Sequence, residues 1–185
     1  MPTTIVTPVD KLIRLLRMRK IYAATKGKHR VLDLGCGDGY FLKSIAKDIE
    51  TGRGIDMIAV PREYGNILFS KDYVVDHIDM KDGCVDCVTM IAFLEHAENA
   101  DGLLQECKRV LSADGIVVFT TPAPLSKPIL DIMAALRIVN PAEIEDHKHY
   151  FDKKEARAVL ERNGFKDVHV GTFEVGLNII ATGKK

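Results

Sequence analysis

The stretch VLDLGCGDG, residues 31–39, decides the fold of this chain. Apolar residues at 31, 32 and 34 predict a buried strand over 30–34, which runs into three alternate glycines, Gly35, Gly37 and Gly39. A helix is expected after the turn, over 40–48. Glycines let the backbone approach a ligand closely, and ligands of helix-flanked parallel sheets bind at the carboxyl edge. We therefore expect a ligand at this turn.

The charges beside the turn indicate which ligand it holds. Asp33 and Asp38 would repel phosphates and suit a cation. A dinucleotide turn reads G-x-G-x-x-G, but Tyr40 stands where the third glycine should fall, and the sequence has no G-x-x-x-x-G-K-[ST] loop. S-adenosylmethionine (SAM) meets these conditions, since it carries a sulfonium, an ammonium and a carboxylate but no phosphate.

Composition limits the class of protein. The 185 residues, 46% of them hydrophobic, predict a single domain over 1–185. Equal numbers of basic and acidic residues, 26 each, argue against a nucleic-acid or membrane partner and favour a small molecule. No apolar run reaches the roughly 18 residues of a membrane span, and the N-terminus is unlike a signal peptide, so a cytoplasmic protein is expected. The four cysteines are expected to be reduced, without metal. A homo-oligomer is left open.

The rest of the chain alternates apolar runs with amphipathic stretches, which is typical of an α/β fold with a parallel sheet. We expect an N-terminal helical cap over 1–26, with its helix at 9–24 and its basic residues facing solvent, and a core over 27–185. An apolar insert at 122–150 interrupts this core. The further expected strands are 53–57, 73–75, 84–91, 116–121, 166–170 and 175–182. The further expected helices are 100–111 and one capped by Asp152 through 162, with only a short or frayed helix in 58–71.

Several motifs resemble those of the class I SAM-dependent methyltransferases. Residues 33–39, DLGCGDG, are similar to the family's D-x-G-x-G-x-G. Residues 82–88, DGCVDCV, resemble the D-x-S-F-D-x-V entry to the fourth strand, and 93–96, FLEH, the L-E-H that follows it. Residues 147–151, HKHYF, and 163–165, NGF, resemble elements of the quinone-pathway methyltransferases.

The resemblance implies a fold and an activity. The fold is a three-layer αβα sandwich around a Rossmann-like, seven-stranded, mostly parallel sheet of order 3-2-1-4-5-7-6, with the last strand antiparallel. The activity is transfer of a methyl group from SAM to an unidentified small-molecule acceptor. Two alternatives stay open, a catalytically inactive SAM-binding partner subunit and a nicotinamide-dependent oxidoreductase, which Tyr40 and the carboxylates disfavour.

The resemblance also implies cofactor contacts along the carboxyl edge. Asp56, at the end of the second strand, is expected to accept hydrogen bonds from the ribose hydroxyls. The acid near the adenine has two candidates, Asp76 and Asp79, of which the short loop favours Asp76. The expected cofactor set is Asp33, Gly35, Cys36, Gly37, Gly39, Asp56, Met57, Asp76, His77, Ile78 and Phe93.

The expected reaction requires few catalytic groups from the protein. Methyl transfer is an in-line displacement at an activated carbon, so positioning does most of the work, and a base is needed only when the acceptor arrives protonated. His96 follows the fourth strand and His149 lies near the end of the insert, so these two are the candidate bases, each with a purely structural alternative. If the apolar insert lines the site, the acceptor has an apolar portion.

Overall fold

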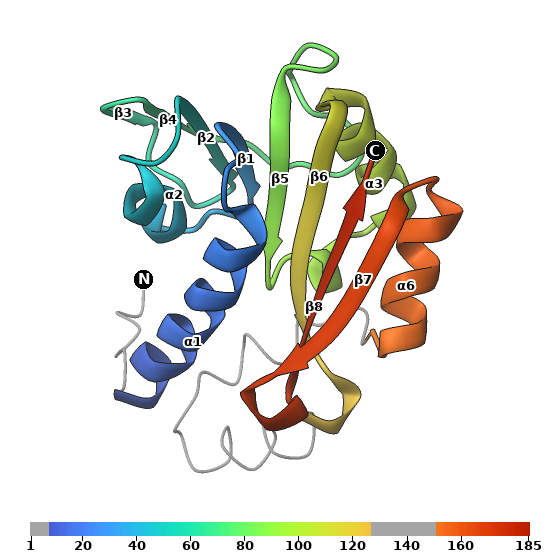
Figure 1. Cartoon of the computed structure of the whole chain (residues 1–185). Coiled ribbons are helices and arrows are strands. Elements are labelled where there is room, and N and C mark those ends of the chain that lie inside the picture. Colours follow the sequence, from blue (N-terminus) through green and yellow to red (C-terminus); the bar gives the residue numbers. More distant parts are fainter. Residues whose placement is uncertain (1–7, 127–150) are drawn as a thin grey trace.

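The computed structural model describes residues 8–126 and 151–185, which form helices around a central sheet (Figure 1). The strands are β1 Arg30–Leu34, β2 Thr51–Asp56, β3 Arg62–Tyr64, β4 Ile67–Lys71, β5 Val85–Ile91, β6 Leu111–Pro122, β7 Lys166–Phe173 and β8 Asn178–Lys184. The helices are α1 Pro8–Thr25, α2 Tyr40–Ile45, α3 Ala100–Val110 and α6 Lys153–Arg162, and the 3-10 turns are η1 Leu94–His96, η2 Pro124–Ser126 and η3 Glu174–Gly176. No helix in the described ranges is both long and apolar enough to cross a bilayer.

The sheet confirms the predicted order of strands. Within the described residues the order is β3-β4-β2-β1-β5-β6-β8-β7. Strand β1 pairs in parallel with β2 and β5, while β8 runs antiparallel to both β6 and β7. When the extra edge strand β3 is set aside, the remaining seven strands follow the predicted 3-2-1-4-5-7-6 order with an antiparallel last strand.

Helices cover both faces of the sheet and bury two separate apolar clusters. Successive side chains of a strand point to opposite faces, so Leu32 of β1 joins one cluster and Val31 the other. The first cluster includes Leu103 of α3 and Val159 of α6, and the second includes Phe41 of α2. This division makes the predicted three-layer sandwich (Figure 1).

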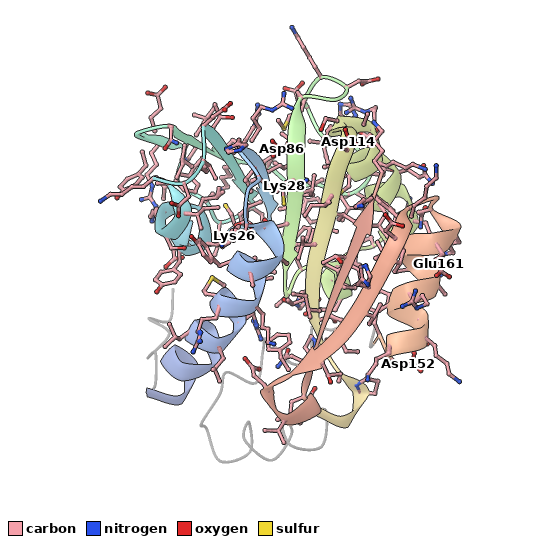
Figure 2. The ribbon with its side chains drawn as sticks, viewed as in Figure 1. Lys26, Lys28, Asp86, Asp114, Asp152 and Glu161 are labelled. Carbon is pink, nitrogen blue, oxygen red and sulfur yellow. The ribbon has the colours of Figure 1, made fainter. Side chains whose placement is uncertain are left out.

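At the amino edge of the sheet, a side chain of β5 accepts hydrogen bonds from the backbone at the start of β1. The Asp86 carboxylate accepts hydrogen bonds from the backbone N–H of Arg30 at 2.9 Å and of His29 at 3.1 Å. Figure 2 shows Asp86 near Lys28 at this edge. The carboxyl ends of the parallel strands, including the glycine turn after β1, therefore lie at the opposite edge.

Between β2 and β5 the structure differs from the predicted secondary structure. Residues 62–71 form the antiparallel hairpin β3–β4, not a frayed helix, and the strand expected at 73–75 is instead β4. Pro61 and Gly65, which has a φ of 58°, disfavour a helix here. Ile67 and Phe69 are buried while Leu68 is exposed, as in a strand.

Helix α1 also presents a different face from the predicted one. Leu15 is 53% and Leu16 38% exposed, although they lie opposite the basic residues that were expected to face solvent. Ile21 and Thr25 are buried instead, and Arg17, one turn before Ile21, is part-buried. Because residues four apart share a helix face, this basic side chain faces the sheet and not the solvent.

Candidate functional site

The glycine turn after β1 is packed at two of its glycines and open at the third. All three have left-handed backbone conformations, with φ of 72° at Gly35, 53° at Gly37 and 75° at Gly39. A Cβ at Gly35 would lie 2.3 Å from the Phe93 ring, and one at Gly39 would lie 2.3 Å from the Phe69 ring. A Cβ at Gly37 would meet nothing within 4 Å. The turn therefore offers its open backbone at Gly37.

Asp56 joins the end of β2 to this turn. Its Oδ2 accepts a hydrogen bond from the backbone N–H of Gly37 at 2.8 Å, and its Oδ1 accepts one from Ile58 at 2.9 Å. The next side chain, Met57, is 57% exposed and Ile58 is 74% exposed. A carboxylate and two apolar side chains thus stand together beside the open glycine.

A second carboxyl group lies beneath the turn. Asp33 on β1 is 2% exposed, and its Oδ1 accepts a hydrogen bond from the Thr89 hydroxyl at 2.6 Å. Burial raises the pKa of Asp33 to about 7, against the hydrogen bond from Thr89, and the nearby Asp56 carboxylate acts in the same direction as burial. A cation bound nearby would favour the ionised form of Asp33.

Cys36 fills space inside the turn. It is buried, and its sulfur lies 2.9 Å from where a Cβ of Gly54 would stand. Burial, with Asp33 and Asp56 nearby, raises the pKa of the thiol to about 12, so it stays protonated at neutral pH. Cys36 therefore contributes packing and not a nucleophile.

Helix α3 holds the residues that were expected near adenine. The His77 ring lies 3.4 Å from the Glu106 carboxylate, and Ile78 is fully buried with its N–H donating to Glu106 at 2.9 Å. Asp76 is exposed, and its Cβ lies 3.1 Å from where a Cβ of Gly102, in the first turn of α3, would stand. None of these contacts joins the three residues to the glycine turn.

Sequence reasoning missed Asp72, which follows β4 directly. Its backbone N–H donates to the carbonyl of Asp56 at 3.2 Å, which places Asp72 at the carboxyl edge beside β2. The short apolar run Ile67–Phe69, bounded by Gly65-Asn66 before it and by polar residues after it, is the sequence signal that could have located this strand end.

The chain after β5 borders the turn on its other side. Phe93 packs on Gly35, and the backbone bends at Ala92, which has a φ of 51°. His96 is part-buried in η1, and its N–H donates to the Phe93 carbonyl at 3.0 Å. His149 and most of the insert at 122–150 lie outside the described residues. The structure therefore places one of the two candidate bases at this edge.

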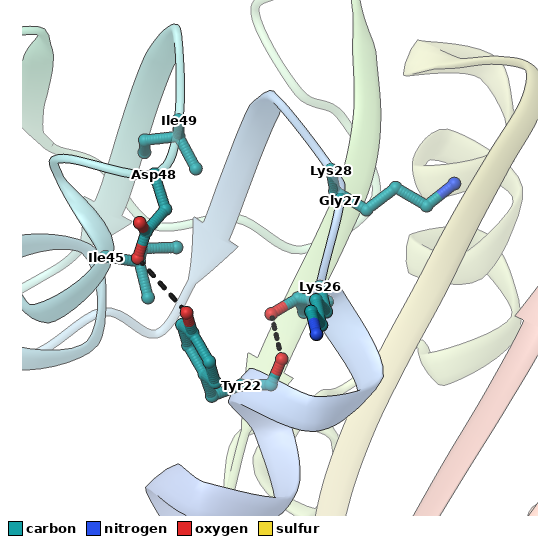
Figure 3. A pocket seen from close by; sticks show the side chains of 8 residues that line it. Tyr22, Lys26, Gly27, Lys28, Ile45, Asp48 and Ile49 are labelled. Carbon is teal, nitrogen blue, oxygen red and sulfur yellow. Dashed lines mark hydrogen bonds between the residues drawn. The ribbon is translucent and has the colours of Figure 1, made fainter.

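A pocket of about 190 Å³ lies elsewhere, at the amino edge (Figure 3). The end of α1 and the residues that precede β1 and β2 line it, and the Tyr22 hydroxyl donates to Asp48 across it at 3.3 Å. This pocket is remote from the strand ends that bear the turn. Among residues 8–126 and 151–185, no three His, Cys, Asp or Glu side chains gather as metal ligands.

Comparisons with known proteins agree on one family. A family model described as a methyltransferase domain matches residues 9–170. The ubiquinone biosynthesis O-methyltransferase of Vibrio parahaemolyticus is 26% identical over 157 residues, which cover 76% of this chain and 65% of that protein. The enzyme of the same name from Actinobacillus pleuropneumoniae is 29% identical over 125 residues, 60% of this chain and 53% of that protein. The chain thus spans about half to two thirds of the length of these curated relatives.

A solved structure shares the fold. The SAM-dependent methyltransferase from Archaeoglobus fulgidus superposes with a TM-score of 0.70 at 22% identity, covering 95% of this chain and 94% of that one. The family model covers most of this chain. The sheet of this chain has the strand order that the resemblance implied. The chain belongs to the methyltransferase domain family.

Proposed function

We propose that this protein transfers a methyl group from SAM to a small-molecule acceptor. The observation that carries the proposal is the turn itself: open backbone at Gly37, tied to the Asp56 carboxylate at 2.8 Å, above the buried carboxyl group of Asp33. The family membership and the predicted resemblance support the same activity.

The residues present fit a cationic nucleoside better than a phosphate ligand. Two carboxyl groups, Asp33 and Asp56, adjoin the turn, and phosphates would be repelled there. Asp56 keeps acceptor lone pairs for ribose hydroxyls while it holds the turn, because each carboxylate oxygen accepts more than one hydrogen bond. Met57 and Ile58 offer exposed apolar surface for a purine, and we add Asp72 to the residues proposed near it.

The protein's share of the chemistry is mainly positioning. SAM, when bound, supplies a methyl group already activated by its sulfonium. The chain would hold the two reactants in line and exclude water, and a base such as His96 or His149 would take a proton only from an acceptor that arrives protonated. The curated relatives are named as O-methyltransferases, which supports a hydroxyl oxygen as the accepting atom. An apolar portion of the acceptor stays a prediction, because most of the insert lies outside the described residues.

The test is transfer of a labelled methyl group from SAM to a panel of small hydroxyl and amine compounds. Gly37→Ala should abolish most turnover, because its new methyl group projects into the open space beside Asp56. Gly27→Ala is the matched control, since Gly27 also has a positive φ, 78°, and open space around it, but lies at the amino edge.

Both alanines should lower stability by about 1 kcal/mol, through their left-handed backbone alone. Loss of turnover in Gly37→Ala only would support the proposal. Equal turnover in the two variants would show that Gly37 does not face the cofactor, and a wild-type chain that labels no acceptor would contradict the proposed activity.

A further inference from the structure

Several buried polar atoms near the carboxyl edge have no hydrogen-bond partner. Among the described residues they include both carboxylate oxygens of Glu95 in η1, Oγ1 of Thr121 at the end of β6, Nε of Arg17 in α1 and Oε1 of Glu174 in η3. Three of these side chains bear charge, and Glu95 is 0% exposed. Since buried polar groups are nearly always paired, such a concentration of unpaired atoms calls for an explanation.

These four side chains belong to one cluster. Arg17 lies close enough to lower the pKa of both Glu95 and Glu174, and the Thr121 hydroxyl lies close enough to lower that of Glu95. Asn178 connects the far side, because it accepts a hydrogen bond from Nη2 of Arg17 at 3.5 Å and donates one to Glu174. We call Arg17, Glu95, Thr121 and Glu174 the Glu95 cluster.

The cluster is not a closed set of ion pairs. In the described part of the chain, Nε of Arg17 and both carboxylate oxygens of Glu95 lack a hydrogen-bond partner, so these two side chains do not form a hydrogen bond through these atoms. Burial raises the pKa of Glu95 to about 7, although its own backbone, His96, Arg17 and Thr121 all act to lower it. Each buried group without a partner costs about 1–3 kcal/mol, so this arrangement lowers the stability of the fold.

The chemistry of the cluster points to a ligand that donates hydrogen bonds. Glu95, Thr121 and Glu174 all present unpaired acceptor oxygens, whereas Arg17 supplies the one unpaired donor nitrogen among these atoms. A metal ion is a poorer match, because no three metal-binding side chains gather in the described residues. The Glu95 cluster also lies near the proposed cofactor site, since Phe93, two residues before Glu95, packs on Gly35 of the turn.

We propose that the Glu95 cluster binds the hydrogen-bond donor of the methyl acceptor, a hydroxyl or a protonated amine, with Glu95 as its main partner. This inference rests on the proposed function and narrows its substrate class. It explains why a buried carboxyl group without a hydrogen-bond partner persists in the core: the acceptor supplies the missing donor, beside the site at which the methyl group is delivered.

The experiment is a nuclear magnetic resonance titration of the full chain, saturated with S-adenosylhomocysteine, at about pH 8, where Glu95 is ionised. The probes are methylammonium, phenol and acetate, which are a charged donor, a neutral donor and an anion without a donor. Methylammonium or phenol should shift the amide signals of Glu95 and Thr121 saturably, and acetate should not. The donor that binds distinguishes an amine acceptor from a hydroxyl acceptor.

Glu95→Gln should weaken binding of that donor at least about tenfold, an effect of roughly 1.4 kcal/mol. Its melting temperature should not fall, because the substitution removes a buried charge without a partner, whereas a purely structural role predicts a fall. Glu50→Gln, at an exposed carboxylate, is the control and should bind like the wild type. If Glu95→Gln does not fold, Thr121→Val tests the same cluster and should also weaken the donor probe.

Two results would overturn the inference: saturable shifts with neither donor, or wild-type affinity in the folded variants. Calorimetric titration with S-adenosylhomocysteine separates this failure from a failure of the proposed function. A chain that binds S-adenosylhomocysteine but no donor probe contradicts the role of the Glu95 cluster alone, and a chain that binds no S-adenosylhomocysteine contradicts the proposed function.

Discussion

Asp33 and Asp56 are carboxyl groups at the same turn, but the fold surrounds them differently. Asp56 accepts backbone hydrogen bonds from Gly37 and Ile58 and stays part-exposed. Asp33 is enclosed on β1 with one hydroxyl partner, Thr89, and burial raises its pKa to about 7. Asp56 therefore shapes the turn, and we propose that it contacts ribose directly while Asp33 acts through its charge.

Replacing Asp56 should weaken cofactor binding. In Asp56→Ala the turn loses its hydrogen bond at Gly37, and the proposed ribose contacts are lost with it. Hydrogen bonds to charged groups contribute about 1.5–3 kcal/mol, so the Kd for S-adenosylhomocysteine should rise roughly 10- to 100-fold. Calorimetry on the folded variant measures this change, and an unchanged Kd would remove Asp56 from the site.

Replacing Asp33 should change how stability depends on pH. The pKa of Asp33 is raised from 3.8 to about 7 on folding, so its contribution is complete below pH 3.8 and is lost as the pH rises through 7. Glu95, raised from 4.5 to about 7, acts in the same direction. Wild-type stability from these two groups should therefore fall between about pH 4 and pH 7, by an amount on the order of a few kcal/mol.

Asn at position 33 keeps an acceptor for Thr89 but cannot ionise. Asp33→Asn should therefore remove about half of the decrease in the free energy of unfolding between about pH 4 and pH 7. Urea unfolding at several pH values measures the free energy of unfolding of both proteins. Parallel pH profiles for wild type and variant would mean that Asp33 titrates normally in the folded protein.

At the scale of elements, local patterns predicted most boundaries. Strand β1 matches its expected range, and the Asp152 cap with the left-handed Gly164 correctly predicted α6. The hairpin β3–β4 was missed because its strands are short and its alternation weak, so Phe69 shows its role only once β4 packs it against Gly39. Periodicity placed α1 but not its buried face, which depends on packing against β6 and β8.

The cap of α6 offers a test of an element remote from the turn. Oδ1 of Asp152 accepts hydrogen bonds from the N–H groups of Lys154 at 2.7 Å and Glu155 at 2.8 Å, and Oε2 of Glu155 accepts one from the N–H of Asp152 at 2.7 Å. Asp152→Ala should lower the free energy of unfolding by about 0.5–2 kcal/mol. Chemical denaturation measures this loss, and affinity for S-adenosylhomocysteine should stay unchanged.

Glu161→Ala, at the other end of the same helix (Figure 2), is the control for this cap. It removes only an exposed pair with Arg157, which contributes about 0–1 kcal/mol. Equal losses in Asp152→Ala and Glu161→Ala would show that the cap does not stabilise α6.

At the scale of the whole molecule, the alternation of strands and helices predicted a parallel sheet, and the resemblance to the methyltransferases supplied its strand order with the antiparallel last strand, here β8. The acceptor side was not predictable. The Glu95 cluster brings together Arg17, Glu95, Thr121 and Glu174, which are far apart in the chain and follow no local pattern. Only tertiary packing shows that these groups are buried together.

Calorimetric titration of the full chain, first with S-adenosylhomocysteine and then with NAD, tests the central claim most directly. The open backbone at Gly37, between the carboxyl groups of Asp33 and Asp56, should accept the cationic SAM and its product but repel a pyrophosphate. We predict saturable heat from S-adenosylhomocysteine and none from NAD. Saturable heat from NAD, with none from S-adenosylhomocysteine, would contradict the account.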